Sequence, residues 1–253
     1  MVVDLQKANL GKRIIAAVFD FILLTILVVG LATLLSGLLQ YDSYMADVND
    51  AYARYEAAYG VKFQISIQEY DALTDAQREA YETAYKALIA DETVLYAYNM
   101  LVNLTLLIVT FSVLISMLAL EFVVPLVLGH GQTLGKKIFG IAVMHTEALR
   151  VTGVQMFART VLGKFAIELM IPLSILLLIY FGSMGVIGLV ILAVLVLAQI
   201  LCLAISRNHS VLHDVLASTV TVDISSQRIF NDRDELVAYT KARHAEQAER
   251  AEY

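Results

Sequence analysis

Long apolar blocks separated by short polar segments dominate the chain. They cover residues 14–39, 94–128, 165–181 and 186–205. A helix needs roughly 20 apolar residues to cross a bilayer. The first, second and fourth blocks meet this length, and the third lies at its short end. Block 94–128 is long enough to tilt or to project from the membrane. The pattern predicts an all-α membrane protein with four transmembrane helices, with residues 182–185 as a tight turn.

The segment 40–93 has a different pattern. Tyr44, Val48, Tyr52, Tyr55 and Tyr59 recur at helical spacing, and Gly60 is expected to end that helix. Two capping boxes then precede helical sequence, Ser66 with Glu69 and Thr74 with Gln77. We expect a helical-hairpin insertion over 40–93. Its tyrosine stripe packs helix on helix in one interpretation and binds a protein partner in the other.

Short alternating runs outside the apolar blocks predict a small β element. Residues 137–144 and 218–222 read as strands. Residues 153–163 read as an amphipathic helix, with Arg159 exposed or at the lipid headgroups. The charged tail, 224–253, is expected to be a surface helix or disordered.

Basic residues predict the orientation of the spans. Segment 40–93 holds four basic and eleven acidic residues, so it is expected outside the cell. The N-terminal flank and segment 129–164 are rich in lysine and arginine. Both termini, segment 129–164 and the β element are therefore expected in the cytoplasm.

Composition narrows the function classes. The chain is 59% hydrophobic and 17% charged, with a mean hydropathy of +0.71 and a net charge of −6. The negative net charge argues against a nucleic-acid partner. The high hydrophobic content indicates the lipid bilayer as the main environment. The single cysteine, Cys202, excludes an intrachain disulfide.

Three acidic residues interrupt the apolar blocks: Asp20, Glu121 and Glu168. An ionised carboxylate inside a span costs roughly 2.5–3.5 kcal/mol unless it is compensated. The predicted topology places the three at similar depth. They form an ion or proton path in one interpretation, and each pairs with a separate base in the other. Candidate partners for Asp20 are Arg13, Arg159 and Arg207.

Other chemistry has weaker support. His209 and His213 have helical ligand spacing, but a zinc site needs further ligands, so no metal is expected. Ser206, Ser210 and Ser218 lie near His213 without the G-x-S-x-G pattern of a hydrolase. We expect neither catalytic residues nor a cofactor.

Three motifs occur in order along the chain, at Gly11 to Asp20, Gly131 to Val143 and His213 to Val222. Together they resemble the RDD family of bacterial membrane proteins. Gly11 to Asp20 is similar to the opening of the family's first helix, Gly131 to Val143 to its cytoplasmic G-x-T-x-G-K block, and His213 to Val222 to its closing H-D-x-x-A-G-T block. The resemblance spans 11–223 and assigns the family's arginine and two aspartates to Arg13, Asp20 and Asp214. Ser218 stands where the family usually has glycine, and the 40–93 insertion is longer than the family's usual outer loop.

The resemblance implies a multi-pass protein of the bacterial plasma membrane with a role in transport. Asp214 is expected to pair with Arg13 or Arg159, and Lys136 and Lys137 to contact lipid phosphates. Our leading hypothesis is transport of ions, protons or a small solute past Asp20. Four spans give few walls for a pore, so a homo-oligomer is expected. The alternative is a non-transporting scaffold or accessory subunit that binds a protein partner at the hairpin.

Overall fold

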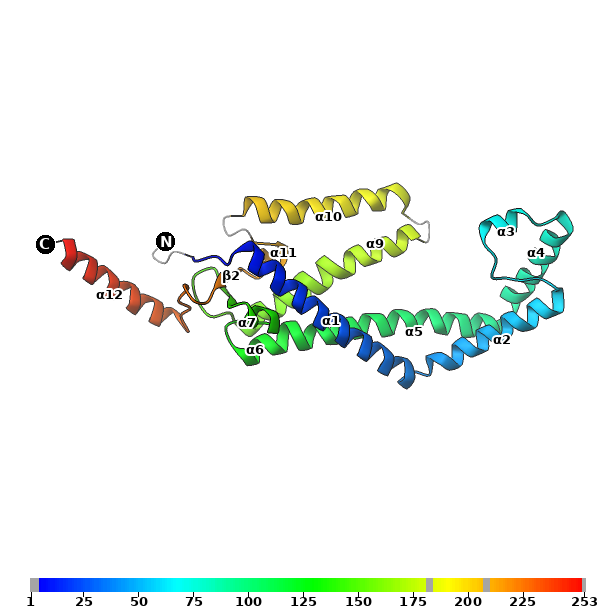
Figure 1. Ribbon diagram of the computed structural model, residues 1–253, viewed down its shortest axis with the longest axis horizontal. Coiled ribbons are helices and arrows are strands. Elements are labelled where there is room, and N and C mark those ends of the chain that lie inside the picture. The colour runs from blue at the N-terminus through cyan, green and yellow to red at the C-terminus, as the bar shows by residue number, and fades with distance from the viewer. Residues whose placement is uncertain (1–4, 181–183, 207–209, 252–253) are drawn as a thin grey trace. The chain divides into compact units, whose positions relative to one another are not determined.

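The computed structural model describes residues 5–180, 184–206 and 210–251, which are mostly helical (Figure 1). The chain divides into two compact units. Unit 1 comprises Met1–Ile26 and Leu114–Tyr253, and unit 2 comprises Leu27–Val113. Both boundaries fall inside long helices, α1 (Leu10–Leu38) and α5 (Glu92–Met117).

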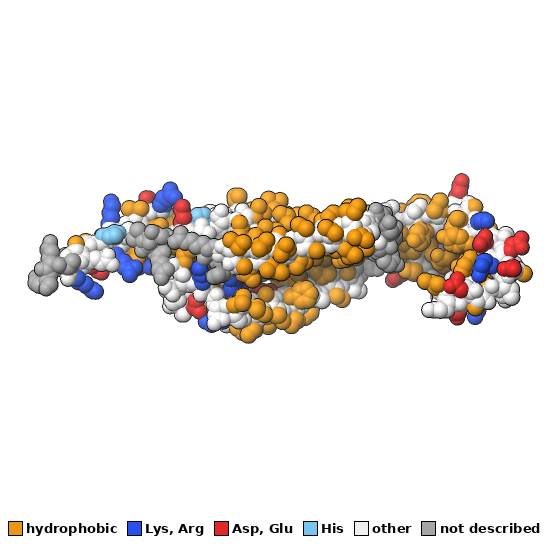
Figure 2. All heavy atoms as spheres, turned by 90° about the horizontal axis from the view of Figure 1, so that it is seen from above, with side chains coloured by type: hydrophobic (Ala, Val, Ile, Leu, Met, Phe, Trp, Pro, Cys, Tyr) orange, Lys and Arg blue, Asp and Glu red, His pale blue; other side chains and the backbone are white. Residues whose placement is uncertain are grey.

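Three helices among the described residues are long and apolar enough to cross a membrane. They are α1, the continuous helix Glu92–Leu128 and α10 (Gly185–Ile205). The second joins α5, the wider π-helical turns of η1 (Leu118–Val123) and α6 (Val124–Leu128). Hydrophobic side chains cover the visible surface of the long helices (Figure 2). Val186 and Ile205, near the two ends of α10, are each 75% exposed, as expected for a surface that faces lipid.

The predicted span 165–181 falls in two consecutive shorter helices. These are η2 (Ala158–Met170), which is π-helical, and α9 (Ile171–Tyr180). They continue α8 (Gly153–Phe157), so the predicted amphipathic helix 153–163 runs directly into the apolar block. α9 packs against α10, where a Cβ on Gly188 would lie 2.6 Å from Ile179. Residues 181–183, including the first half of the predicted turn 182–185, lie outside the described residues.

Unit 2 contains α2 (Tyr41–Tyr59), α3 (Ile67–Asp71) and α4 (Asp75–Ala90). The structure confirms Gly60 as the left-handed end of α2, with φ of 65°, and confirms both capping boxes. α2 packs against α4. Val48 is buried with Ala97 and Leu101, and Tyr44 and Tyr52 cover this cluster. The tyrosine stripe therefore contributes to helix packing.

Two short helix–strand pairs lie in unit 1. They are α7 (Leu134–Ile138) followed by β1 (Ile141–His145), and α11 (Leu212–Leu216) followed by β2 (Thr219–Asp223). The strands form a two-stranded antiparallel sheet in which Val143 lies opposite Thr221. The strand predicted over 137–144 was wrong in its first half, because Lys137 and Ile138 belong to α7.

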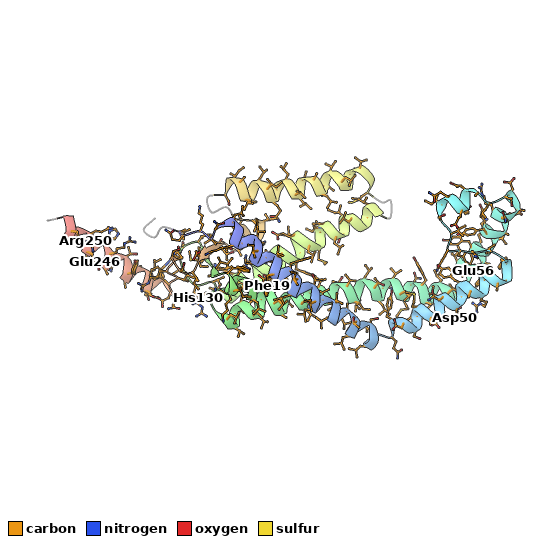
Figure 3. The ribbon with its side chains drawn as sticks, in the orientation of Figure 1. Phe19, Asp50, Glu56, His130, Glu246 and Arg250 are labelled. Carbon is orange, nitrogen blue, oxygen red and sulfur yellow. The ribbon has the colours of Figure 1, made fainter. Side chains whose placement is uncertain are left out.

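The sheet carries a small hydrophobic core. Ala142, Met144, Val220, Val222 and Phe230 are buried together. The tail forms α12 (Arg233–Ala251), and its first turns pack Leu236 and Tyr239 against this core. The tail is thus a helix that begins on the sheet, and Glu246 and Arg250 mark its far end in Figure 3.

Candidate functional site

Asp20 binds the first turn of α7. Its Oδ1 atom accepts a hydrogen bond from the Gly135 backbone N–H at 2.8 Å, and its Oδ2 atom accepts one from the Thr133 hydroxyl. Lys136 Nζ lies 3.7 Å from Oδ2. A Cβ on Gly135 would lie 2.4 Å from the Ala16 carbonyl oxygen, so only glycine allows this approach of α7 to α1. In Figure 3 the label Phe19 marks this part of α1, one residue before Asp20.

The partner of Asp20 corrects the sequence prediction. Arg13 and Arg159 were expected there, but the base within ion-pair distance of Asp20 among the described residues is Lys136. Arg207, the third candidate, and His209 lie outside the described residues. The prediction considered only arginines, whereas α7 brings Lys136 and the donors of Thr133 and Gly135 to Asp20.

Glu168 binds α11 in the same manner. Its Oε1 atom accepts a hydrogen bond from the His213 backbone N–H at 3.0 Å, and its Oε2 atom lies 2.9 Å from His213 Nδ1. A Cβ on Gly163 would lie 2.5 Å from His213 Cβ. Gln199 of α10 accepts a further hydrogen bond from the Leu212 N–H at 3.1 Å. Side chains from two apolar helices therefore hold the start of α11.

Arg159 and Asp214 form a buried ion pair. Arg159 Nε donates to Asp214 Oδ1 at 2.8 Å, and Thr219 donates its hydroxyl to the same oxygen at 2.8 Å. Arg13 Nη2 lies 4.0 Å from Asp214 Oδ2, so both arginines predicted as partners lie beside this carboxylate. Arg159 is only 2% exposed, which corrects the prediction of an exposed residue on an amphipathic helix.

Burial and neighbouring groups shift the pKa values of Asp214 and His213. Burial alone would raise the pKa of Asp214, but Arg159, His213 and the Thr219 hydroxyl hold the pKa below its ordinary value. Burial and the charge of Arg159 lower the pKa of His213. A neutral His213 that donates from Nδ1 to Glu168 presents Nε2 as an acceptor to Arg159 Nη2, 3.1 Å away.

Glu121 pairs with Lys164, a different basic residue from those that bind Asp20 and Glu168. Lys164 Nζ donates to Glu121 Oε2 at 2.6 Å, and the Thr160 hydroxyl donates to the Glu121 carbonyl at 2.9 Å. Asp20, Glu121 and Glu168 are thus each bound by a different basic group, as in the second of the two interpretations drawn from the sequence. The described residues contain no group of three or more histidine, cysteine or acidic side chains that could hold a metal ion.

The two short helix–strand pairs are structurally equivalent. Each has a five-residue helix, then two linking residues, then a five-residue strand. The second linking residue is left-handed in both, with φ of 66° at Gly140 and 53° at Ser218. Val143 and Thr221 occupy the central position of their strands and lie opposite each other, so the pairing has an approximate two-fold symmetry.

The segments that precede α1 and α8 make contacts with the sheet that follow the same two-fold symmetry. Lys7, three residues before α1, bridges to Val222 in β2, and Arg150, three residues before α8, bridges to Met144 in β1. Val222 and Met144 occupy the same position in their strands. Asp20 and Glu168 likewise bind N–H groups at the same position of α7 and α11, those of Gly135 and His213.

These contacts, together with the order of the elements along the chain, divide the membrane helices into two corresponding halves. The first contains α1, the helix Glu92–Leu128, α7 and β1. The second contains η2 with α9, then α10, α11 and β2.

A cavity of about 390 Å³ lies between these halves in unit 1. Basic side chains from both halves line it: Arg13, Lys136, Arg159 and Lys164. His213 and Asp214 complete its polar wall. Burial lowers the pKa of Lys136 to about 8, because the charged ammonium is partly removed from water. The cavity thus concentrates positive charge where four different elements meet.

A comparison with protein families matches the RDD family over residues 7–218. The chain belongs to the RDD family. The match covers the first half, the segment between the halves and the second half up to the start of β2. Neither the curated proteins nor the solved structures compared with this RDD-family chain give a match.

The structure brings most of the RDD motif residues to one site. Arg13, His213 and Asp214 line the cavity, and Asp20 binds α7 beside it. Lys136 also lines the cavity, whereas Lys137 is exposed. The sequence prediction missed Thr133 and Gly135 as ligands of Asp20.

The equivalence of the two halves was also missed. The sequence carries little signal of it, since an alignment of 133–145 with 211–223 leaves only Leu134 and Leu212 identical.

Proposed function

We propose that this RDD-family protein transports ions, protons or a small solute across the bacterial plasma membrane. The observation that supports the proposal is the charged cavity between two equivalent halves. Transporters are often built from repeats, and their substrate sites lie at the interface between the repeats. Repeats that run in the same direction, such as those proposed here, are one form of this design.

The proposed topology has four spans, with two in each half. They are α1, the helix Glu92–Leu128, η2 with α9, and α10. Both termini and the sheet would then lie in the cytoplasm, and α2 to α4 outside, as the distribution of basic residues favours. Four helices give few walls for a continuous pore, so the transporting species would be a homo-oligomer.

Buried ionisable groups are a second feature in support of the proposal, beside the cavity. Ionisable groups inside membrane helices are costly and usually mark an ion or proton pathway. Here Asp20, Glu121 and Glu168 each have a base within 4 Å. A proton or ion that binds to such a pair changes the net charge of the pair. In addition, η2 is π-helical, and π-helical turns are frequently found at functional sites.

Flux through proteoliposomes tests the proposal. The variant Asp20→Asn keeps an amide oxygen for the Gly135 N–H but removes the negative charge beside Lys136. Asp234→Asn, on the exposed part of α12, is the matched control. We expect ion or proton flux above background for the native chain and the control, and a loss of at least about tenfold for Asp20→Asn, in line with one charge-assisted hydrogen bond. Background flux in all three would refute transport.

An apolar groove in unit 2 favours the scaffold alternative. Tyr52, Tyr85, Ile89, Leu95 and Tyr98 line a groove of about 210 Å³. Tyr85 and Tyr98 are about half exposed, and aromatic residues are enriched in protein interfaces. Replacing both tyrosines with serine should abolish cross-linking to a membrane partner and leave flux unchanged if the protein is an accessory subunit.

A further inference from the structure

The cavity between the two halves has more basic groups than acidic ones on its wall. Four basic side chains line it, from α1, α7 and η2, against the single carboxylate of Asp214. Asp214 Oδ1 is already occupied by Arg159 and Thr219. Lys164 is neutralised by Glu121 at 2.6 Å. Asp20 lies 3.7 Å from Lys136 and Asp214 binds Arg159, so two of the three remaining positive charges are offset. One positive charge remains in excess.

Two of these side chains have N–H donors that could bind a further acceptor. Arg159 Nη1 is buried and has no hydrogen-bond partner among the described residues. A buried donor without a partner costs about 1–3 kcal/mol, more when it is charged. Lys136 Nζ donates to the Thr133 hydroxyl at 3.1 Å and lies 3.7 Å from Asp20, which is beyond hydrogen-bond distance. An acceptor supplied by a ligand would satisfy both groups.

We propose that this cavity binds a phosphate group, held by Arg13, Lys136 and Arg159. Arginine and lysine are the residues that most often bind phosphate, and arginine does so through two parallel N–H donors. The three side chains come from three elements, α1, α7 and η2, and so reach the cavity from different sides. A tetrahedral phosphate offers oxygens in several directions, whereas a planar carboxylate offers only two in one plane.

The rest of the cavity indicates that the phosphate is attached to a larger molecule. A volume of about 390 Å³ is in the range of cavities that hold small organic ligands. Leu10, Ile14 and Leu203 form an apolar part of the wall next to the basic groups. Such a wall suits either a phosphorylated metabolite or the headgroup and upper acyl chain of an anionic phospholipid. Both present the same phosphate chemistry.

This inference rests on the proposed function, because it names the class of ligand that the same cavity binds. Ligand binding can be measured separately from flux, so the two proposals can fail separately. Absence of phosphate binding in a chain that conducts ions would overturn the inference alone. Absence of flux in a chain that binds phosphate would overturn the proposed transport alone.

Binding to the full chain in phosphatidylcholine nanodiscs tests the inference in two arms. The first measures equilibrium binding of radiolabelled inorganic phosphate. The second measures retention of phosphatidic acid by native mass spectrometry. The informative variant is Lys136→Gln, and its matched control is Lys137→Gln, the adjacent and exposed lysine outside the cavity. Loss of one charge-assisted hydrogen bond should weaken binding by about tenfold in Lys136→Gln. The control should stay within about twofold of the native chain.

The outcomes separate the sources of the phosphate. Saturable binding in the first arm supports a soluble phosphate compound, and binding in the second arm alone supports a phospholipid. No saturable binding in either arm, or equal weakening by the two lysine variants, would overturn the inference. If Lys136→Gln fails to fold, Arg13→Gln replaces it.

Discussion

Gly135→Ala is the sharpest test of how the site is assembled. The added Cβ would lie 2.4 Å from the Ala16 carbonyl oxygen and 2.9 Å from Asp20 Oδ1. Both neighbours belong to α1, and the first is backbone, so α7 must move away from α1. The movement would break the hydrogen bond from the Gly135 N–H to Asp20.

Two contributions give the expected magnitude. Overpacking costs about 1–3 kcal/mol, and loss of a hydrogen bond to a charged group costs about 1.5–3 kcal/mol. Together they lower the free energy of unfolding by about 3–5 kcal/mol. For a chain of this size each kcal/mol shifts Tm by roughly 2–4 °C, so we expect a decrease of about 10 °C.

Thermal unfolding of the purified chain in detergent measures this effect. Gly163→Ala should behave alike, because its Cβ would lie 2.5 Å from His213 Cβ at the equivalent contact of the second half. Gly153→Ala is the matched control, since its Cβ would meet nothing within 4 Å. If all three variants melted within about 2 °C of one another, the close approach of the short helices to the long ones would be refuted.

Two further predictions concern single residues of the same helix–strand pairs. Ser218 adopts a left-handed conformation with φ of 53°, so Ser218→Gly should raise the free energy of unfolding by about 1 kcal/mol; a lower Tm than the native chain would contradict this. Burial lowers the pKa of Lys136 from its ordinary value of 10.5 to about 8. The cost of its charged form is therefore fully present below pH 8 and is relieved as the pH rises to 10.5. Stability should therefore gain about 3 kcal/mol over that window, and Lys136→Met, compared by denaturation at pH 7 and pH 10, should lack the gain.

Features that depend on neighbouring residues could be predicted from the sequence. Three of the four apolar blocks form helices long enough to cross a membrane, because a span requires only a sufficient run of apolar residues. Gly60 and the capping boxes at Ser66 and Thr74 appeared where they were expected, since their hydrogen bonds join residues a few positions apart. The motif carried by Arg13, Asp20 and Asp214 likewise sufficed to indicate the RDD family.

Contacts between distant segments were decided by the tertiary structure. Asp20 is bound by Thr133 and Gly135, more than a hundred residues away, because α7 packs on α1 through a glycine. Arg159 is buried for a similar reason, since α11 brings Asp214 to it. No local pattern distinguishes these pairings from the alternatives, because opposite charges attract whatever their separation in sequence. The cavity and its excess of basic groups form where the two halves meet. Its lining residues come from distant parts of the chain, so no short segment of the sequence predicts it.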